Sequence, residues 1–144
     1  MRILVSACLL GENCKYNGKN NRNETLLRRL QGHEVVPVCP EVLGGLGVPR
    51  PCVELRDGVA YNQYGENVDA AFHAGVDKAL AQIAGQQIDL VILQSRSPTC
   101  GVKQIYDGTF SKQLIDGQGM LAAALQARGY RLADVEDIDG VPEL

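Results

Sequence analysis

Short apolar runs alternate with amphipathic segments along most of this 144-residue chain. The runs are rich in β-branched residues and are not interrupted by polar ones, a pattern typical of strands covered on both faces in a parallel sheet. The sequence predicts strands at residues 2–7, 34–38, 88–94 and 130–135. Apolar positions three or four residues apart predict helices at residues 24–31, 68–83 and 118–128.

A strand, helix, strand order implies parallel strands joined by right-handed crossovers. Residues 53–56 and 59–61 flank an Asp-Gly pair and predict a small hairpin. The glycine- and proline-rich residues 42–51 predict a loop, and residues 101–110 predict a loop or an irregular hairpin. We therefore expect one compact α/β domain over residues 1–144, an open, mostly parallel sheet with flanking helices and a small hairpin insertion. An acidic tail from about residue 136 is expected to pack loosely.

The composition favours a small-molecule partner. A net charge of −3 and a pI near 5.3 argue against a protein that binds the nucleic-acid backbone, and the absence of Trp leaves few platforms for stacked bases. The apolar start, residues 3–10, is too short for a signal peptide. No segment has the roughly 20 apolar residues of a membrane span. We expect a cytoplasmic protein without a nucleic-acid or membrane partner.

The chain has five cysteines, an odd number, and they are widely spaced. This pattern favours reduced thiols over a disulfide scaffold. Cys8, Cys39 and Cys100 each follow a predicted strand within a few residues. The carboxyl ends of parallel strands meet at one edge of a sheet, where loops converge and ligands bind. We therefore expect these three thiols to lie together at that edge.

Cys100 lies in a turn formed by residues 95–101, directly after the third predicted strand of the sheet. Pro98 fixes its own φ and favours extended geometry at Ser97, while Gly101 permits an unusual backbone angle after Cys100. This turn is expected to be a rigid support for a reactive group.

Thiolates bind soft or borderline metals, chiefly zinc and iron–sulfur clusters. Three thiolates on a centre that prefers four ligands leave one position open, as in a reactive site. The spacing does not separate zinc from iron–sulfur, and no Cys-x-x-Cys pair is present. Alternatively, each thiol is a small buried hydrophobic group. Cys14 and Cys52 can ligate, form a disulfide or do neither.

Two further residues are candidates for catalysis. Glu41 lies two residues beyond Cys39, and a carboxylate beside thiolates can donate or accept a proton, unless it only caps a helix or lies at the surface. The Ser97 hydroxyl can bind a substrate or cap its own turn. Loop cations near the same edge can hold a polar substrate or be merely solvated; they are Lys15, Arg50, Arg96 and Lys103.

Motifs between residue 2 and about residue 125 together resemble the DUF523 family, whose characterised members include thiouracil desulfidases. The motifs are Ser6-Ala7-Cys8-Leu9-Leu10-Gly11, Cys14-Lys15-Tyr16-Asn17-Gly18, Cys39-Pro40-Glu41, Gly44-Gly45-Leu46, Pro49-Arg50-Pro51, Ser97-Pro98-Thr99-Cys100-Gly101 and Tyr106-Asp107-Gly108-Thr109-Phe110. The family often has Arg-Tyr-Asp where this chain has Lys15-Tyr16-Asn17, and a small or apolar residue is expected in place of Cys52. Both differences concern the substrate pocket.

The resemblance implies a compact α/β domain with a [4Fe-4S] cluster held by three cysteines, so that one iron is free for the substrate's sulfur. It makes Cys8, Cys39 and Cys100 the ligands, Glu41 the acid/base and Ser97 an assisting hydroxyl.

The function expected from this resemblance is removal of sulfur from a thiolated pyrimidine such as thiouracil. The reaction would be a non-redox hydrolysis that gives the oxo-base and sulfide. One alternative is a cluster-dependent sulfur transferase or lyase that acts on another sulfur compound. Another is a metal- or cluster-bearing binding module without turnover, in which Cys14 would close the site as a fourth ligand.

Overall fold

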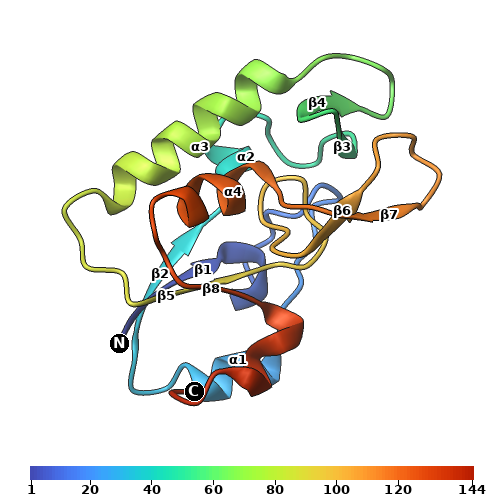
Figure 1. The fold of residues 1–144 in the computed structure, drawn as a ribbon. Helices are drawn as coiled ribbons and strands as arrows, with labels where there is room; N and C mark the ends of the chain where they lie inside the picture. The colour runs from blue at the N-terminus through green and yellow to red at the C-terminus, as the bar shows by residue number, and fades with distance from the viewer.

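The protein, described over residues 1–144 by a computed structural model, is built around a four-stranded parallel sheet with the order β2-β1-β5-β8 (Figure 1). The strands of this sheet are β1 (Arg2–Ser6), β2 (Glu34–Val38), β5 (Leu90–Leu93) and β8 (Leu132–Asp134). The predicted α/β class and mostly parallel sheet are confirmed, and all four strands lie within or coincide with the predicted segments.

Helices cover both faces of the sheet. They are α1 (Glu24–Arg29), α2 (Pro40–Leu43), α3 (Asp69–Ile83) and α4 (Met120–Ala127), with 3-10 helices η1 (Ala7–Leu10) and η2 (Val135–Gly140). Alternate side chains of a strand point to opposite faces, so Leu4 and Val91 pack toward α3 and α4 while Ile3 and Ile92 pack toward α1 and η2. The central strand β5 is buried at every residue because both faces are covered.

The three helices predicted from apolar spacing are present. Asn23 caps α1 by accepting a hydrogen bond from the Leu26 backbone N–H at 2.9 Å. On α3, the buried residues are those that the spacing placed on one face, including Phe72, Val76 and Ile83. None of the helices combines the length and the apolar character that a membrane span requires.

Two hairpins extend beyond the sheet. The predicted hairpin is present as β3 (Val53–Arg56) and β4 (Val59–Asn62), which pair antiparallel. A second hairpin pairs β6 (Gln104–Tyr106) with β7 (Leu114–Asp116). Of the two structures predicted for residues 101–110, a loop or an irregular hairpin, the hairpin is therefore present. Its second strand lies beyond the predicted range.

The loop expected over residues 42–51 begins inside the short helix α2, which the sequence analysis did not predict. This helix packs on α3 with almost no space between the two backbones. A Cβ added at Gly75 would lie 1.9 Å from the Pro40 carbonyl oxygen, and one at Gly44 would lie 2.2 Å from the Ala71 carbonyl oxygen. Two glycines therefore allow the contact that fixes α2, and with it the side chain of Glu41.

The expectation of a loosely packed tail is wrong. Ile138 and Val141 are buried against the α1 face of the sheet, and Asp139 forms an ion pair with Arg29. The acidic residues of the tail point outward, and the apolar residues between them supply enough burial to order it.

Candidate active site

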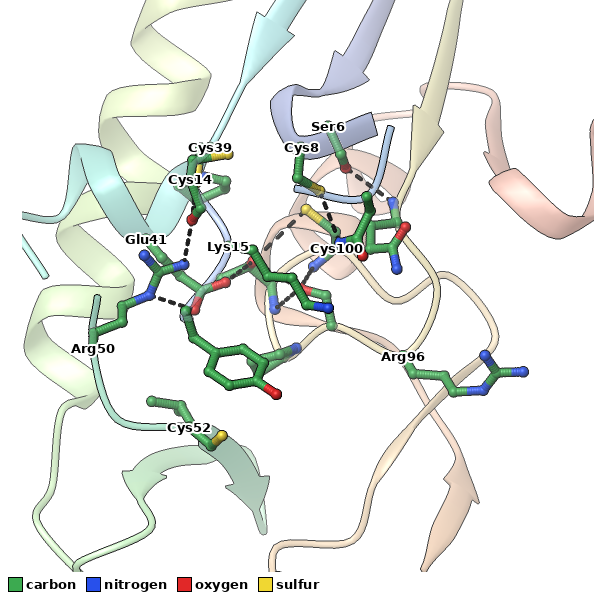
Figure 2. Close-up of a pocket in the computed structure, with 18 of the residues that line it drawn as sticks. Ser6, Cys8, Cys14, Lys15, Cys39, Glu41, Arg50, Cys52, Arg96 and Cys100 are labelled. Atoms are coloured by element: carbon green, nitrogen blue, oxygen red, sulfur yellow. Dashed lines mark hydrogen bonds and ion pairs between the residues drawn. The ribbon is translucent and has the colours of Figure 1, made fainter. Parts of the chain in front are cut away.

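A cavity of about 630 Å³ opens at the carboxyl ends of β1, β2 and β5. Each of these strands delivers one cysteine to its wall. Cys8 lies in η1 after β1, Cys39 precedes α2 after β2, and Cys100 lies in the turn after β5. Figure 2 shows the sulfur atoms of Cys8 and Cys100 turned toward each other and that of Cys39 directed toward the same space. Glu41 and Ser97 line the same cavity.

Cys14 brings a fourth thiol into this group. It is buried and lines the same cavity, and its carbonyl oxygen lies 4.0 Å from the Cys39 sulfur. Cys52 lines the outer part of the cavity, where it lies close to Tyr16 and raises the pKa of that phenol. The structure therefore groups Cys14, the only cysteine expected as a possible fourth ligand, with the strand-end thiols, whereas Cys52 lies beside Tyr16.

The hydrogen bonds of Cys14 divide the thiols into two kinds. Hydrogen bonding with the Cys14 thiol lowers the pKa of Cys39 to about 7 and lowers the pKa of Cys8, although its single proton can stabilise only one of the two thiolates at a time. The same bonds raise the pKa of Cys14, which keeps its proton. Burial raises the pKa of Cys100 to about 12. One of Cys8 and Cys39 thus ionises most easily, beside a Cys14 that stays protonated.

Glu41 is fixed from two sides. Its Oε2 accepts a hydrogen bond of 3.0 Å from the Thr99 hydroxyl, and its Oε1 lies 3.4 Å from Nε of Arg50. The Arg50 side chain is 5% exposed and also donates to the carbonyl oxygens of Cys14 and Gly47, at 2.9 and 3.0 Å. Of the four loop cations, Arg50 is therefore the one built into the site.

Thr99 was not singled out by sequence reasoning, although it lies within the turn that carries Cys100. Its side chain is buried, and its hydroxyl contacts Glu41 and, at 3.7 Å, the Cys100 sulfur. Ser97 has a different position. Its Oγ accepts hydrogen bonds from the backbone N–H groups of Thr99 and Cys100, at 3.2 and 3.0 Å. The Ser97 hydroxyl thus holds the turn together.

Gly101 is required for a different reason from the one expected. It is not among the glycines with positive φ. A Cβ at this position would instead lie 2.7 Å from the Gln104 carbonyl oxygen and 2.9 Å from that of Ser97. The glycine therefore allows close backbone packing around the turn.

The remaining candidate cations differ in position. Lys15 and Arg96 line the cavity, but the guanidinium of Arg96 forms an ion pair with Glu136 and extends away from the thiols (Figure 2). Lys103 pairs with Asp137 and does not contribute to the cavity wall. The outer wall includes three residues that sequence reasoning did not propose, namely Tyr106, Phe110 and Lys112.

The donors around the cavity suit an iron–sulfur cluster. No three His, Cys, Asp or Glu side chains converge closely enough to hold a single metal ion. A cluster has several irons that each take their own thiolate, so its ligands are spread around a larger volume. Cys8, Cys39 and Cys100 surround the cavity in this way, and no histidine lines it.

Comparison with known proteins agrees with this site. A family model described as 2-thiouracil desulfurase matches residues 3–137. The chain belongs to this family. The resemblance to DUF523 is thereby confirmed, since this family and DUF523 are the same.

Two similar proteins are known. The uncharacterized protein YbbK of Bacillus subtilis (strain 168) is 35% identical to this chain, in an alignment that covers 96% of this chain and 99% of YbbK. The solved structure of the [4Fe-4S]-dependent thiouracil desulfidase TudS is similar with a TM-score of 0.90 and 33% identity, over 97% of this chain and 94% of that one.

Proposed function

We propose that this chain is a [4Fe-4S]-dependent desulfidase that removes sulfur from a thiolated pyrimidine such as thiouracil. The observation that carries the proposal is the meeting of Cys8, Cys39 and Cys100 with Glu41 at one cavity. The chain's family and its similarity to TudS, a thiouracil desulfidase by name, support the same reaction class.

Cys8, Cys39 and Cys100 would hold the cluster as thiolates. When bound, the cluster supplies a Lewis-acidic iron without a protein thiolate, at which the substrate's sulfur is taken up. A closed site with Cys14 as fourth ligand is the second candidate, because Cys14 lines the same cavity. The open site is favoured because Cys8, Cys39 and Cys100 each follow a strand of the sheet, whereas Cys14 lies in the loop after η1.

Glu41 would accept and donate a proton during the hydrolysis. Water adds to the carbon that carries sulfur and gives a proton to the Glu41 carboxylate, which returns it to the departing sulfur. The products are the oxo-base and hydrogen sulfide, so atoms balance and no electrons are exchanged. Thr99 and Arg50 hold the carboxylate oxygens in place during these transfers. Ser97 assists through its contact with the Thr99 hydroxyl, 3.1 Å away.

The proposed setting is the cytoplasm, with a small molecule as the partner. All five cysteines are free in the structure, as a reducing compartment would keep them. The aromatic side chains of Tyr16, Tyr106 and Phe110 on the outer wall suit a planar heterocycle that enters toward the thiols.

The test is anaerobic turnover. The protein is purified without oxygen, its iron and acid-labile sulfide are measured, and it is incubated with 2-thiouracil or 4-thiouracil. The proposal expects the oxo-base and sulfide to form in equal amounts without an added reductant. Cluster-bearing protein that releases sulfide from neither compound would overturn the proposed reaction.

A further inference from the structure

Asn21 holds Cys8 at two points. Its backbone N–H donates to the Cys8 carbonyl oxygen at 2.9 Å, and its side-chain Nδ2 lies 3.5 Å from the Cys8 sulfur. The side chain of Asn21 lines the cavity and forms no other hydrogen bond within the protein. The Cys8 sulfur is therefore the only acceptor that the Asn21 amide N–H groups have within the protein.

The other two proposed ligand thiols lie in different surroundings. The Cys39 sulfur lies 4.0 Å from the Cys14 carbonyl oxygen. The Cys100 sulfur lies 3.7 Å from the Thr99 hydroxyl, whose single proton is donated to Glu41. Asn21 differs from Thr99 because its amide has no acceptor other than the Cys8 sulfur and it does not contact Glu41. Replacing Asn21 therefore leaves the hydrogen bonds of Glu41 in place.

We propose that Asn21 is a positioning residue for the cluster, whose amide N–H donates a hydrogen bond to the ligand sulfur of Cys8. Such a bond withdraws electron density from the sulfur and stabilises the reduced cluster, which raises its reduction potential. It also fixes the orientation of the ligand, and outer contacts of this kind strengthen metal retention. The inference rests on the ligand assignment of the proposed function, but not on the identity of the substrate.

The test compares Asn21→Leu and Asn21→Asp with a neighbouring control. Leu has nearly the shape of Asn without a donor, and Asp has its shape with a negative charge in place of the N–H groups. The control is Asn20→Leu, because Asn20 is exposed, contacts Asn13 and the backbone of Arg22, and touches no thiol. Each protein is reconstituted anaerobically with iron and sulfide, and circular dichroism checks that it is folded.

Two readouts are independent of turnover. A redox titration followed by electron paramagnetic resonance gives the reduction potential, and the decay of visible absorbance with a chelator gives the rate of iron loss. Asn21→Leu is expected to shift the potential to lower values and to lose iron about tenfold faster. Asn21→Asp is expected to shift the potential further in the same direction. Asn20→Leu should match the wild type in both measurements.

The proposal is overturned if Asn21→Leu keeps the wild-type potential and rate of iron loss, or if Asn20→Leu changes them equally. A wild-type protein that takes up no cluster would overturn it together with the proposed function. A wild-type protein that holds a cluster but releases no sulfide from thiouracil overturns only the proposed reaction, and the comparison of potentials still decides the role of Asn21.

Discussion

The hydroxyl of Thr99 donates a hydrogen bond of 3.0 Å to the carboxylate of Glu41, across 58 positions of sequence. One residue belongs to α2 and the other to the turn after β5, so the bond joins the surroundings of Cys39 to those of Cys100. It gives the carboxylate a defined orientation toward the cavity.

Replacing Glu41 by Gln should abolish most of the activity without removing the cluster. Gln keeps the shape of Glu and can accept the Thr99 hydrogen bond, but it cannot take up a proton from water. We expect kcat with thiouracil to fall by about 10²- to 10⁴-fold, the usual value of a general acid/base. Iron content and the visible spectrum, measured on the same samples, should be unchanged. Glu34→Gln, at an exposed ion pair with Arg2, serves as the control; equal turnover by the two variants would rule Glu41 out.

Thr99→Val should lower kcat about tenfold, because the Glu41 carboxylate loses the hydrogen bond that orients it. A tenfold loss corresponds to about 1.4 kcal/mol, the usual contribution of one hydrogen bond. Thr99→Ser keeps the hydroxyl and should stay near the wild type. In a Glu41→Gln background the Thr99→Val substitution should have little further effect on kcat, because the two residues act through one contact. Independent, multiplicative effects of the two substitutions would contradict the link.

Gly75→Ala should destabilise the protein, although helices normally favour Ala over Gly. Ala in place of Gly in a helix normally stabilises by about 1 kcal/mol. Here the added Cβ would lie 1.9 Å from the Pro40 carbonyl oxygen, so α2 must move. We expect a net loss of about 1–3 kcal/mol in urea unfolding. Gly140→Ala, where no atom lies within 4 Å, should be close to neutral, and equal stabilities of the two variants would contradict the packing described for α2.

The thiols should differ in reactivity when the protein is free of cluster. Thiolates react with iodoacetamide and thiols do not, and the pKa of Cys39 is lowered to about 7 by the hydrogen bond from Cys14. Alkylation of Cys39, followed by peptide mass spectrometry, should therefore rise with pH with a midpoint near 7. Cys100, with a pKa of about 12, should stay unmodified at neutral pH. Cys14→Ala removes the donor and should move the Cys39 midpoint upward; an unchanged midpoint would show that another group sets it.

Much of this arrangement could be predicted from strand ends alone. Parallel strands place their carboxyl ends at one edge, so Cys8, Cys39 and Cys100 could be brought together without any knowledge of the side chains between them. Thr99 could not be found in this way, because its importance depends on α2, and α2 is a four-residue helix with no periodic pattern to detect. Its position is set by backbone contact at glycines.

The position of Cys14 among the other thiols also could not be predicted from the sequence. Its contacts with Cys8 and Cys39 depend on how a long polar loop folds back over the sheet edge, and a loop has no periodicity from which to deduce that path. The packing of the tail does not follow from its acidic charge. It follows from Ile138 and Val141, which are buried although acidic residues surround them.

The most direct test of the account is the iron and acid-labile sulfide content of anaerobically reconstituted protein, measured for the wild type and for the serine variants of all five cysteines. The account predicts about four irons and four sulfides per chain in the wild type, Cys14→Ser and Cys52→Ser. It predicts loss of most of the iron in Cys8→Ser, Cys39→Ser and Cys100→Ser. Full iron content in any of these last three, or its loss in Cys14→Ser, would contradict the ligand assignment.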